Sequence, residues 1–425
     1  MNWKTIIPLA GALLLIVTLG LLQGKKLGAF NQLQEESPTP ETSISHTLPH
    51  GSLIDANTKF AFHLFAAMRA KQPQENIFIS PTSAAMALAM TYNGAQGTTS
   101  AEMARGLEVP EMSREEVNEG FQALALHLDL LNGDEDVNLA IANSLWLRED
   151  FPLKEAFRQD TQEFYDAEAT ELDFTNPGAK DIINSWVKEN TEGKIDSIVE
   201  QISPSDVLYL INAIYFQGNW TYQFDKNLTT EKPFYLADGK TKQQSMMSRN
   251  GEYNYYENDD FQAITLPYGE DRLLEMAIFL PSYNSNLAAF TTQLTPENWE
   301  LWQGRFSKRE GLFQMPRFQL EYEVELNHAL QSLGMKTMFQ PGRADFSAMS
   351  PSSVYVNGVR HKTFINVKEE GTEAAGVTSV GIRITSVSQP RENFTMIVDR
   401  PFFCTIQDKE TGSILFMGAI LEPEG

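Results

Sequence analysis

The residues of this sequence that most often carry enzyme or metal chemistry are six histidines and a single cysteine. No two histidines form an HExxH motif, and His46 and His50 lie in a proline-rich stretch where no helix would align their rings. Cys404 lies in an apolar, strand-like run, which is typical of an unreactive core position, and a lone cysteine excludes an intrachain disulfide. Phosphate-binding loops and G-x-S-x-G elbows are absent from the sequence. We therefore predict no enzyme activity, no metal site and no cofactor.

Charge also narrows the classes of partner. The chain has 56 acidic and 33 basic residues among its 425, for a formal net charge of −23. Such a surface repels phosphate backbones, so nucleic acid is not an expected partner. Three glutamates, Glu321, Glu323 and Glu325, alternate along a predicted strand, and we interpret them as a solvated strand edge rather than as an acid–base pair.

The segment over residues 368–390 has the most unusual pattern. Read with a period of two, its face from position 372 to position 384 is uncharged, whereas the other face carries Glu373 and Arg383. The run Ala374-Ala375-Gly376 weakens a strand and favours flexibility. This combination fits a segment that is a loop in one state and a strand in another, and an ordinary strand with a flexible turn is the alternative.

The N-terminal fifty residues differ in composition from the rest of the chain. Twenty uncharged residues (5–24) follow Lys4, and this run predicts that residues 1–24 are either a secretory signal peptide or an uncleaved membrane anchor. Residues 25–52, with Pro38, Pro40 and Pro49 among polar residues, have the composition of a flexible linker. We expect an exported protein, extracellular or periplasmic, whose folded domain is 53–425 and whose residues 5–24 form a membrane tether if they are retained.

Periodicity predicts helices in the first half of the folded part and strands in the second. The helices are expected over 55–71, 82–92, 153–165, 179–190 and 324–333, and capping boxes at Thr99/Glu102 and Ser113/Glu116 predict two more. The helix over 82–92 is apolar nearly all round, so it should be buried, and Asn93-Gly94 should end it in a left-handed turn. Strands are expected over 76–79, 137–147, 207–216, 261–267, 273–280, 312–320, 353–367, 394–406 and 414–420. This order predicts an α+β fold in one large domain.

The chain from about residue 53 to the end resembles a serpin, a member of the serine protease inhibitor superfamily. The motifs that carry the resemblance occur in the family's order: NIFISPTS from Asn76, NAIYFQGNW from Asn212, LPY from Leu266, FLP from Phe279, MPRF from Met315, LGM from Leu333, DFS from Asp345, EEGTEAAG from Glu369, DRPF from Asp399 and LFMG from Leu415. Each motif alone is weak evidence for the family, but all of them in the same order over nearly the whole domain are highly specific.

This resemblance implies a fold, a mechanism and a set of site residues. The fold would have helices packed on large, mainly antiparallel sheets and an exposed reactive loop, in a protein that acts as a monomer. A target serine protease would cut the loop, and the loop would insert into the central sheet with the acyl-linked protease attached. The implied hinge of the loop comprises Glu369, Gly371, Thr372, Glu373, Ala374, Ala375 and Gly376. The implied shutter and breach beneath and beside the sheet comprise Ser80, Ser83, Asn212, Trp220 and His361.

The family's commonest loop length places the reactive bond fourteen residues beyond Gly371, between Thr385 and Ser386. A small aliphatic residue there suits elastase-like or subtilisin-like proteases, whereas the alternatives are Ile384 and, for a trypsin-like protease, Arg383. Two alternative hypotheses for the function remain. One is a non-inhibitory serpin-fold binding protein. The other is a membrane-anchored hydrolase, for which no nucleophile–base pair is found.

The sequence is compatible with both a bacterial and a eukaryotic organism of origin. The lack of disulfides suits a bacterial envelope protein. The sequons at Asn219, Asn227 and Asn393 would matter only in a eukaryotic secretory pathway.

Overall fold

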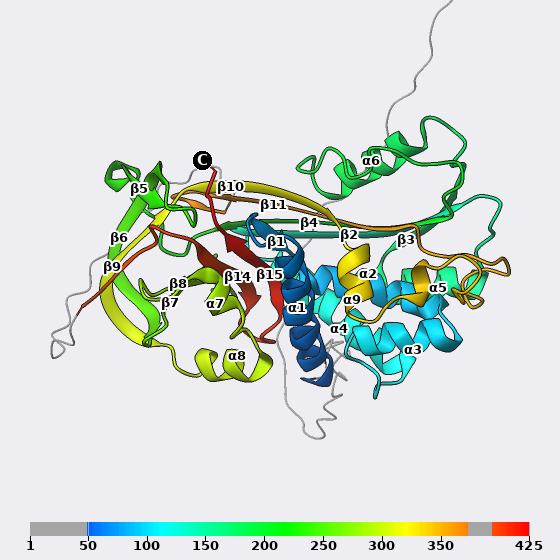
Figure 1. The fold of residues 1–425 in the computed structure, drawn as a ribbon, viewed down its shortest axis with the longest axis horizontal. Coiled ribbons are helices and arrows are strands. Elements are labelled where there is room, and N and C mark those ends of the chain that lie inside the picture. The colour runs from blue at the N-terminus through cyan, green and yellow to red at the C-terminus, as the bar shows by residue number, and fades with distance from the viewer. Residues whose placement is uncertain (1–48, 50, 373–392, 425) are drawn as a thin grey trace, which may run out of the picture. The chain divides into compact units, whose positions relative to one another are not determined.

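Two β-sheets and the helices packed on them make up the computed structural model, which describes residues 49, 51–372 and 393–424 (Figure 1). The helices are α1 (Gly51–Lys71), α2 (Pro81–Gly94), α3 (Gly97–Gly106), α4 (Arg114–Leu131), α5 (Glu155–Tyr165), α6 (Ala179–Asn190), α7 (Leu287–Thr291), α8 (Pro296–Gln303) and α9 (Asn327–Ser332), with 3₁₀ turns η1 (Lys226–Leu228) and η2 (Thr337–Phe339). None of these helices is both long enough and apolar enough to cross a membrane.

The strands form one nine-stranded and one six-stranded sheet. They are β1 (Ile77–Ile79), β2 (Val137–Arg148), β3 (Glu168–Leu172), β4 (Leu208–Asn219), β5 (Thr230–Tyr235), β6 (Thr241–Glu257), β7 (Phe261–Pro267), β8 (Leu274–Pro281), β9 (Ser307–Pro316), β10 (Phe318–Glu325), β11 (Gly358–Val367), β12 (Gly371–Thr372), β13 (Phe394–Ile397), β14 (Phe402–Asp408) and β15 (Ile414–Ile420). The nine-stranded sheet has the order β1-β15-β14-β8-β7-β6-β9-β13, with β5 paired to β6, and the six-stranded sheet has the order β10-β11-β12-β4-β2-β3. Helices packed on large, mainly antiparallel sheets confirm the predicted α+β fold class.

Helix α2 lies between the two sheets and is the centre of the core. It contacts β15 of one sheet and β2 and β4 of the other, and all of its residues are buried, as its all-round apolar sequence predicts. Its N-terminus is capped by Ser80, whose hydroxyl accepts a hydrogen bond from the Ser83 amide, and Pro81 follows at the first helical position. The Ser80-Pro81 pair therefore fixes where this buried helix begins.

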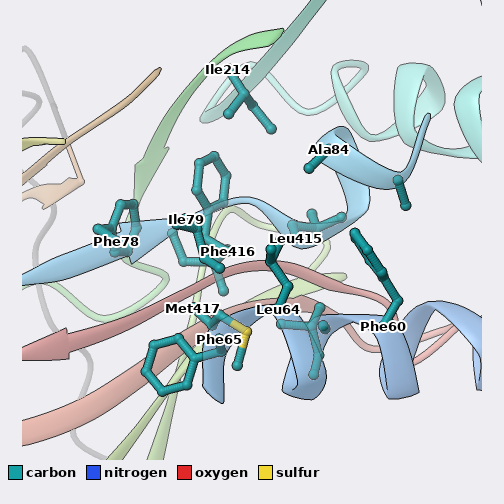
Figure 2. Close-up of a cluster of buried hydrophobic side chains, with 14 of the residues drawn as sticks. Phe60, Leu64, Phe65, Phe78, Ile79, Ala84, Ile214, Leu415, Phe416 and Met417 are labelled. Carbon is teal, nitrogen blue, oxygen red and sulfur yellow. The ribbon is translucent and has the colours of Figure 1, made fainter. Parts of the chain in front are cut away.

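Side chains from distant parts of the chain meet around α2 (Figure 2). Phe60 and Leu64 of α1 lie near β15, and Phe78 of β1 stacks on Phe416 of β15 with ring centroids 5.4 Å apart. Ile214 of β4 faces this cluster from the six-stranded sheet. The contacts join both sheets and the first helix in one hydrophobic core.

The centre of the six-stranded sheet, around β4, is buried on both faces. Helix α6 covers the face opposite α2, where Ile183 and Val187 pack with Trp146 of β2 and with Ile211 and Ala213 of β4 (Figure 1). Burial on both faces explains why β4 is a nearly continuous apolar run instead of an alternating one. Polar side chains that point into this layer need partners, and the functional site is built from them.

One of the two predicted capping boxes is wrong. Ser113 and Glu116 form the predicted box at the start of α4, with Glu116 bonded back to the Ser113 amide. Helix α3, however, begins two residues before Thr99, which lies inside it and is fully buried. The Thr99 hydroxyl accepts from the Asp345 amide, and Glu102 accepts from Lys336 and Thr337, so this pair binds a distant segment instead of its own helix end.

Several helices and strands differ from the prediction, including the four that follow. Helix α2 continues through Gly94 and is followed by Ala95 in an extended conformation, so the predicted left-handed turn is wrong. The strand predicted over 312–320 is two strands separated at Arg317, and the one predicted over 394–406 is two strands separated at 398–401. The long strand β6 was not predicted, because its polar side chains do not alternate regularly with apolar ones.

Candidate functional site

The strand arrangement at the middle of the six-stranded sheet is the first feature of the site. Strands β4 and β11 run parallel and pair directly from Tyr209/Gly358 to Tyr215/Phe364. Beyond that point β12 lies between them, antiparallel to both, with Thr372 opposite Val367 on one side and Gly218 on the other. The two strands therefore separate at one end, and β12 fills the gap between them there.

Two aromatic side chains hold β12 at this opening. The Trp220 indole stacks on Tyr268 with centroids 4.4 Å apart, and its Nε1 donates to the Lys368 carbonyl at 2.9 Å. The Tyr268 hydroxyl lies 2.7 Å from the Thr372 hydroxyl, and both side chains are fully buried. Burial raises the pKa of Tyr268 well above its ordinary value, so the phenol is neutral and can bond with Thr372. We call Trp220, Tyr268 and Thr372, with Arg317 and Glu369 below, the breach cluster.

The turn between β11 and β12 requires glycine at position 371. The Lys368 amide donates to the Gly371 carbonyl at 2.8 Å, which closes the turn. A Cβ at Gly371 would lie 2.1 Å from the carbonyl oxygen of Gly218 and 2.5 Å from the Cα of Asn219. Backbone atoms of β4 cannot yield as a flexible side chain would, so any larger residue would force β12 to move away from β4.

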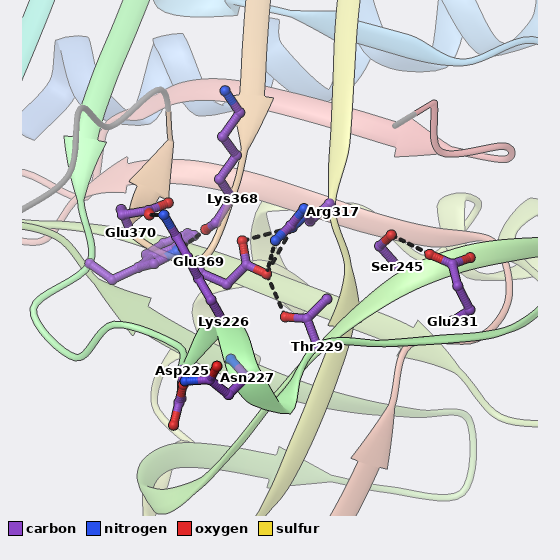
Figure 3. A network of polar contacts seen from close by, with 11 residues as sticks. Asp225, Lys226, Asn227, Thr229, Glu231, Ser245, Arg317, Lys368, Glu369 and Glu370 are labelled. Atoms are coloured by element: carbon purple, nitrogen blue, oxygen red, sulfur yellow. Dashed lines mark hydrogen bonds and ion pairs between the residues drawn. The ribbon is translucent and has the colours of Figure 1, made fainter.

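An ion pair fixes the same turn from the other side (Figure 3). Arg317 donates from Nε to both carboxylate oxygens of Glu369 at 2.7 Å and from Nη2 at 2.5 Å, and Thr229 also donates to this carboxylate. Burial disfavours the charge of Glu369, but the bonds from Arg317 and Thr229 outweigh it, so the pKa of the carboxyl is lowered. The neighbouring Glu370 pairs with Lys226. These ion pairs join the turn to β9, β10 and η1.

A second polar cluster crosses the sheet under α2. Asn212 of β4 donates from Nδ2 to the Ser83 hydroxyl and to Asn143 Oδ1 of β2, both at 2.5 Å, and its Oδ1 is 2.5 Å from His361 Nδ1 of β11. The Ser80 amide donates to His361 Nε2 at 3.0 Å. We call Ser80, Ser83, Asn143, Asn212 and His361 the shutter cluster. It connects the start of α2 to three neighbouring strands.

The hydrogen bonds of His361 determine its tautomer. Because Nε2 accepts from the Ser80 amide, the ring proton is on Nδ1, which donates to Asn212. Burial lowers the pKa of His361 to about 3, so the ring is neutral at physiological pH. A neutral ring with one donor and one acceptor is fully satisfied in this position.

The shutter cluster is sensitive to the separation of β4 and β11. Asn212 and His361 are direct partners in the parallel ladder of these strands. A strand inserted between them would move the two side chains apart by one strand spacing, about 4.8 Å. Their hydrogen bond exists only while the two strands are adjacent, so the cluster distinguishes the closed sheet from an opened one.

The structure brings together most of the predicted site residues that it describes. Glu369, Gly371 and Thr372 lie with Trp220 in or beside the breach cluster, and Ser80, Ser83, Asn212 and His361 form the shutter cluster. The following predicted residues lie outside the described part of the chain: hinge residues Glu373, Ala374, Ala375 and Gly376, and reactive-bond candidates Arg383, Ile384, Thr385 and Ser386.

Sequence reasoning missed Asn143, Tyr268 and Arg317 as members of these clusters. Asn143 is a polar residue inside the predicted strand over 137–147, and this alone could have marked it as a buried polar group needing a partner. Tyr268 and Arg317 belong to the LPY and MPRF motifs, but no pattern within those motifs shows which distant residues they contact.

Two other side chains of potentially reactive types, His127 and Cys404, have structural roles. His127 pairs with Asp408 at 2.9 Å, and Asp408 also accepts from the Thr411 hydroxyl in the turn after β14, so the pair ties α4 to that turn. Cys404 is buried, as predicted, and burial raises the pKa of its thiol to about 12. Among the described residues, no group of three or more histidine, cysteine or acidic side chains could hold a metal ion.

Comparisons with known proteins agree with the fold and the motifs. The family model "Serpin (serine protease inhibitor)" matches residues 55–423. The chain is 36% identical to human leukocyte elastase inhibitor over 87% of its own length and 99% of that protein. It is 35% identical to a serpin-like protein of the archaeon Thermococcus kodakarensis, over 93% and 96% of the two chains. Native tengpin, a thermophilic serpin, is among the similar solved structures, with a TM-score of 0.79 and 33% identity over 87% of this chain and 94% of that one. Human thyroxine-binding globulin is another, with a TM-score of 0.81 and 25% identity over 88% of this chain and 99% of that one.

Proposed function

The chain belongs to the serpin family, and from this premise we propose that it inhibits a serine protease by inserting its own cleaved loop into the six-stranded sheet. Members of this family are mostly protease inhibitors rather than enzymes, and they bind target proteases. Leukocyte elastase inhibitor is a relative at 36% identity, whereas thyroxine-binding globulin has the same fold and binds thyroxine. The family alone therefore leaves inhibition and ligand carriage open.

The position of β12 is the observation that carries the proposal. Two neighbouring strands that run parallel can both accept one antiparallel strand between them, and β12 already pairs in this way with β4 and β11. Extension of β12 by the following residues would replace one parallel ladder with two antiparallel ladders, which are slightly more stable per residue. The geometry supports a strand that grows from Thr372 toward the shutter cluster.

The composition of the hinge supports entry of the loop. Thr372 is fully buried and points toward Tyr268, so the inward face of the inserting segment begins at this residue. The next inward positions are Ala374 and Gly376. Small uncharged side chains can enter a buried layer without steric cost and without the cost of burying a charge. A ligand carrier has no need for this pattern, so the hinge favours inhibition.

The reactive bond is the second part of the proposal. With the family's loop length, the cleaved bond is Thr385–Ser386, and the small residue before it suits an elastase-like or subtilisin-like protease. Cleavage after Arg383 by a trypsin-like protease is the rival. That cut would shorten the inserting strand by two residues, about 7 Å, and would carry the protease less far.

Incubation of the purified chain with elastase, subtilisin, chymotrypsin and trypsin tests both parts. We expect a complex with elastase or subtilisin that survives SDS, and mass analysis of the released fragment should place the cut after Thr385. A complex with trypsin and a cut after Arg383 would overturn the target class but not the inhibition. Clean cleavage by every protease with no complex would overturn the inhibition and favour a carrier.

We also propose that the protein is exported and acts as a monomer on an extracellular or periplasmic protease. The support for export is the uncharged run over residues 5–24 and the linker-like composition of residues 25–52. Fractionation of the producing cells, with N-terminal sequencing of the mature protein, would separate a cleaved signal peptide from a retained tether. Recovery of the full-length chain in the cytoplasm alone would contradict export.

A further inference from the structure

A pocket of about 470 Å³ lies away from the two polar clusters, between the end of α1 and the segments that flank β5, β8 and β14. Its walls are formed by residues 69, 73–74, 235–237, 281, 285–288, 400–401 and 421. Its volume is within the range of pockets that enclose small molecules. The inhibitory mechanism makes no use of it.

Arg69 is the buried cation of this pocket. It lies in the last turn of α1 with 8% of its surface exposed, and it donates to the carbonyls of Gln72, Pro73 and Glu75. These bonds fix the turn after α1, but neutral carbonyls do not neutralise a guanidinium charge. The Nε of Arg69 is buried without a hydrogen-bond partner, and no carboxylate of the described residues forms an ion pair with it. A buried charge of this kind is costly until an anion compensates it.

Arg400 places a second guanidinium in the pocket wall. Its Nε and Nη2 donate to the Pro281 carbonyl, and its Nη1 pairs with Asp399 at 2.8 Å. Its guanidinium also lies 3.8 Å from the ring centroid of Tyr283, which is 76% exposed. Of the two arginines, only Arg400 has a carboxylate partner, Asp399, and no acidic side chain lines the pocket. In a chain of net charge −23, this is a local excess of positive charge.

The rest of the lining is mainly apolar. Leu236, Leu287, Pro281, Pro401 and Leu421 provide hydrophobic surface. An apolar cavity with a few convergent polar groups is typical of sites that bind a small molecule with one polar end. The charge of that end is set by the arginines.

We propose that this pocket binds a small organic anion, with a carboxylate or sulfonate head at Arg69 and Arg400 and an apolar body against the leucines and prolines. Guanidinium groups present paired donors that match the oxygens of such a head. Binding would compensate the charge of Arg69.

The test uses two fluorescent probes of the same shape and the full chain. 8-Anilinonaphthalene-1-sulfonate carries the anionic head, and N-phenyl-1-naphthylamine lacks it. We expect the anionic probe to bind the wild type at least tenfold more tightly than the neutral one, and Arg69→Gln to reduce that preference. Equal affinity for the two probes would overturn the anion site.

A pair of neighbouring variants locates the binding without altering either arginine. Ala288 lines the pocket, whereas Ala289 is exposed beside it and does not. Ala288→Trp should weaken binding of the anionic probe at least tenfold, and Ala289→Trp should leave it within twofold of the wild type. Undiminished binding to Ala288→Trp would show that the probe binds elsewhere and would overturn the proposal, even if Arg69→Gln fails to fold.

Discussion

Because His361 is buried, its protonation makes the stability of the folded chain depend on pH. Its neutral ring accepts from Ser80 and donates to Asn212, and burial lowers its pKa to about 3 from an ordinary value near 6.5. Between these two values, the unfolded chain binds a proton that the folded chain does not. The contribution of His361 to stability is therefore complete above about pH 6.5 and is lost as the pH falls toward about 3.

We predict that part of the loss of stability in acid comes from this residue. The free energy of unfolding of the wild type should fall by up to about 1.4 kcal/mol per pH unit between pH 6.5 and pH 3 through this group. His361→Gln should be less stable at pH 7 and should depend less on pH in that window. Urea denaturation at a series of pH values measures both, and parallel pH profiles for the two proteins would contradict the assignment.

A second prediction concerns Gly371, where backbone atoms of β4 leave no room for a side chain. The Cβ of Gly371→Ala would meet the Gly218 carbonyl at 2.1 Å, so β12 would have to move out of the sheet. We expect a loss of about 1–3 kcal/mol in the free energy of unfolding, measured by urea denaturation. Gly51→Ala, where a Cβ meets nothing within 4 Å, is the matched control. If the two variants are equally stable, the close approach at Gly371 is not required.

At the scale of elements, the important contact is between β4 and β11. The shutter cluster joins these strands through one side-chain bond, Asn212 to His361, and joins both to the start of α2 through Ser80 and Ser83. The parallel ladder between the strands can open only if these bonds break. The cluster therefore opposes opening of the sheet, and its strength would influence how readily the proposed loop insertion occurs.

Asn212→Ala tests this opposition. The substitution leaves the donor of His361 and the acceptor of Asn143 unpaired, and each buried unsatisfied group costs about 1–3 kcal/mol. We predict faster hydrogen exchange of the backbone amides in β4 and β11, measured by mass spectrometry. Asn190→Ala, at an exposed residue that donates to the Trp186 carbonyl, is the control. Unchanged exchange in both strands would mean that the cluster does not hold the sheet closed.

At the scale of the whole molecule, the native state holds an incomplete sheet. Strands β4 and β11 are paired directly although a strand could lie between them along most of their length. With a lone buried cysteine, no disulfide secures this arrangement, and packing around α2 and the polar clusters must hold it. A chain that gains strand pairing on cleavage would be more stable after it is cut than before.

We predict that cleavage of the loop raises the thermal stability of the chain. Insertion of residues 373–385 would add hydrogen bonds on both sides of a new strand, each worth about 0.5–1.5 kcal/mol. The midpoint of thermal unfolding should therefore rise by at least about 10 °C after loop cleavage. Differential scanning calorimetry of the intact and cleaved chains measures the shift.

Thr372→Arg provides the control for this prediction. Thr372 is fully buried and bonded to Tyr268, so an arginine there would place a charge in the layer that the loop must enter. This variant should be cut like the wild type but should gain no stability and form no complex, whereas Thr372→Ser should behave as the wild type does. A large gain in the arginine variant would argue against insertion at β12.

Local patterns in the sequence predicted the parts of this protein that depend on neighbouring residues. The buried α2 and the Ser113 capping box each follow from a few adjacent residues, and the ordered motifs predicted the fold class. The hinge composition predicted an uncharged face beginning at Thr372. These features are determined by short-range periodicity and by the cap and turn preferences of single residues.

Only the tertiary structure decided which distant groups meet. Thr99 and Glu102 have the pattern of a capping box, but partners more than 230 residues away bind them instead. Likewise, Asn143, Asn212 and His361 become one cluster only because three strands distant in sequence are neighbours, and Gly371 is required because another strand passes within contact. Periodicity describes which face of an element is apolar. It contains no information about which backbone or side chain will lie against that face, because long-range packing of the whole core determines that choice.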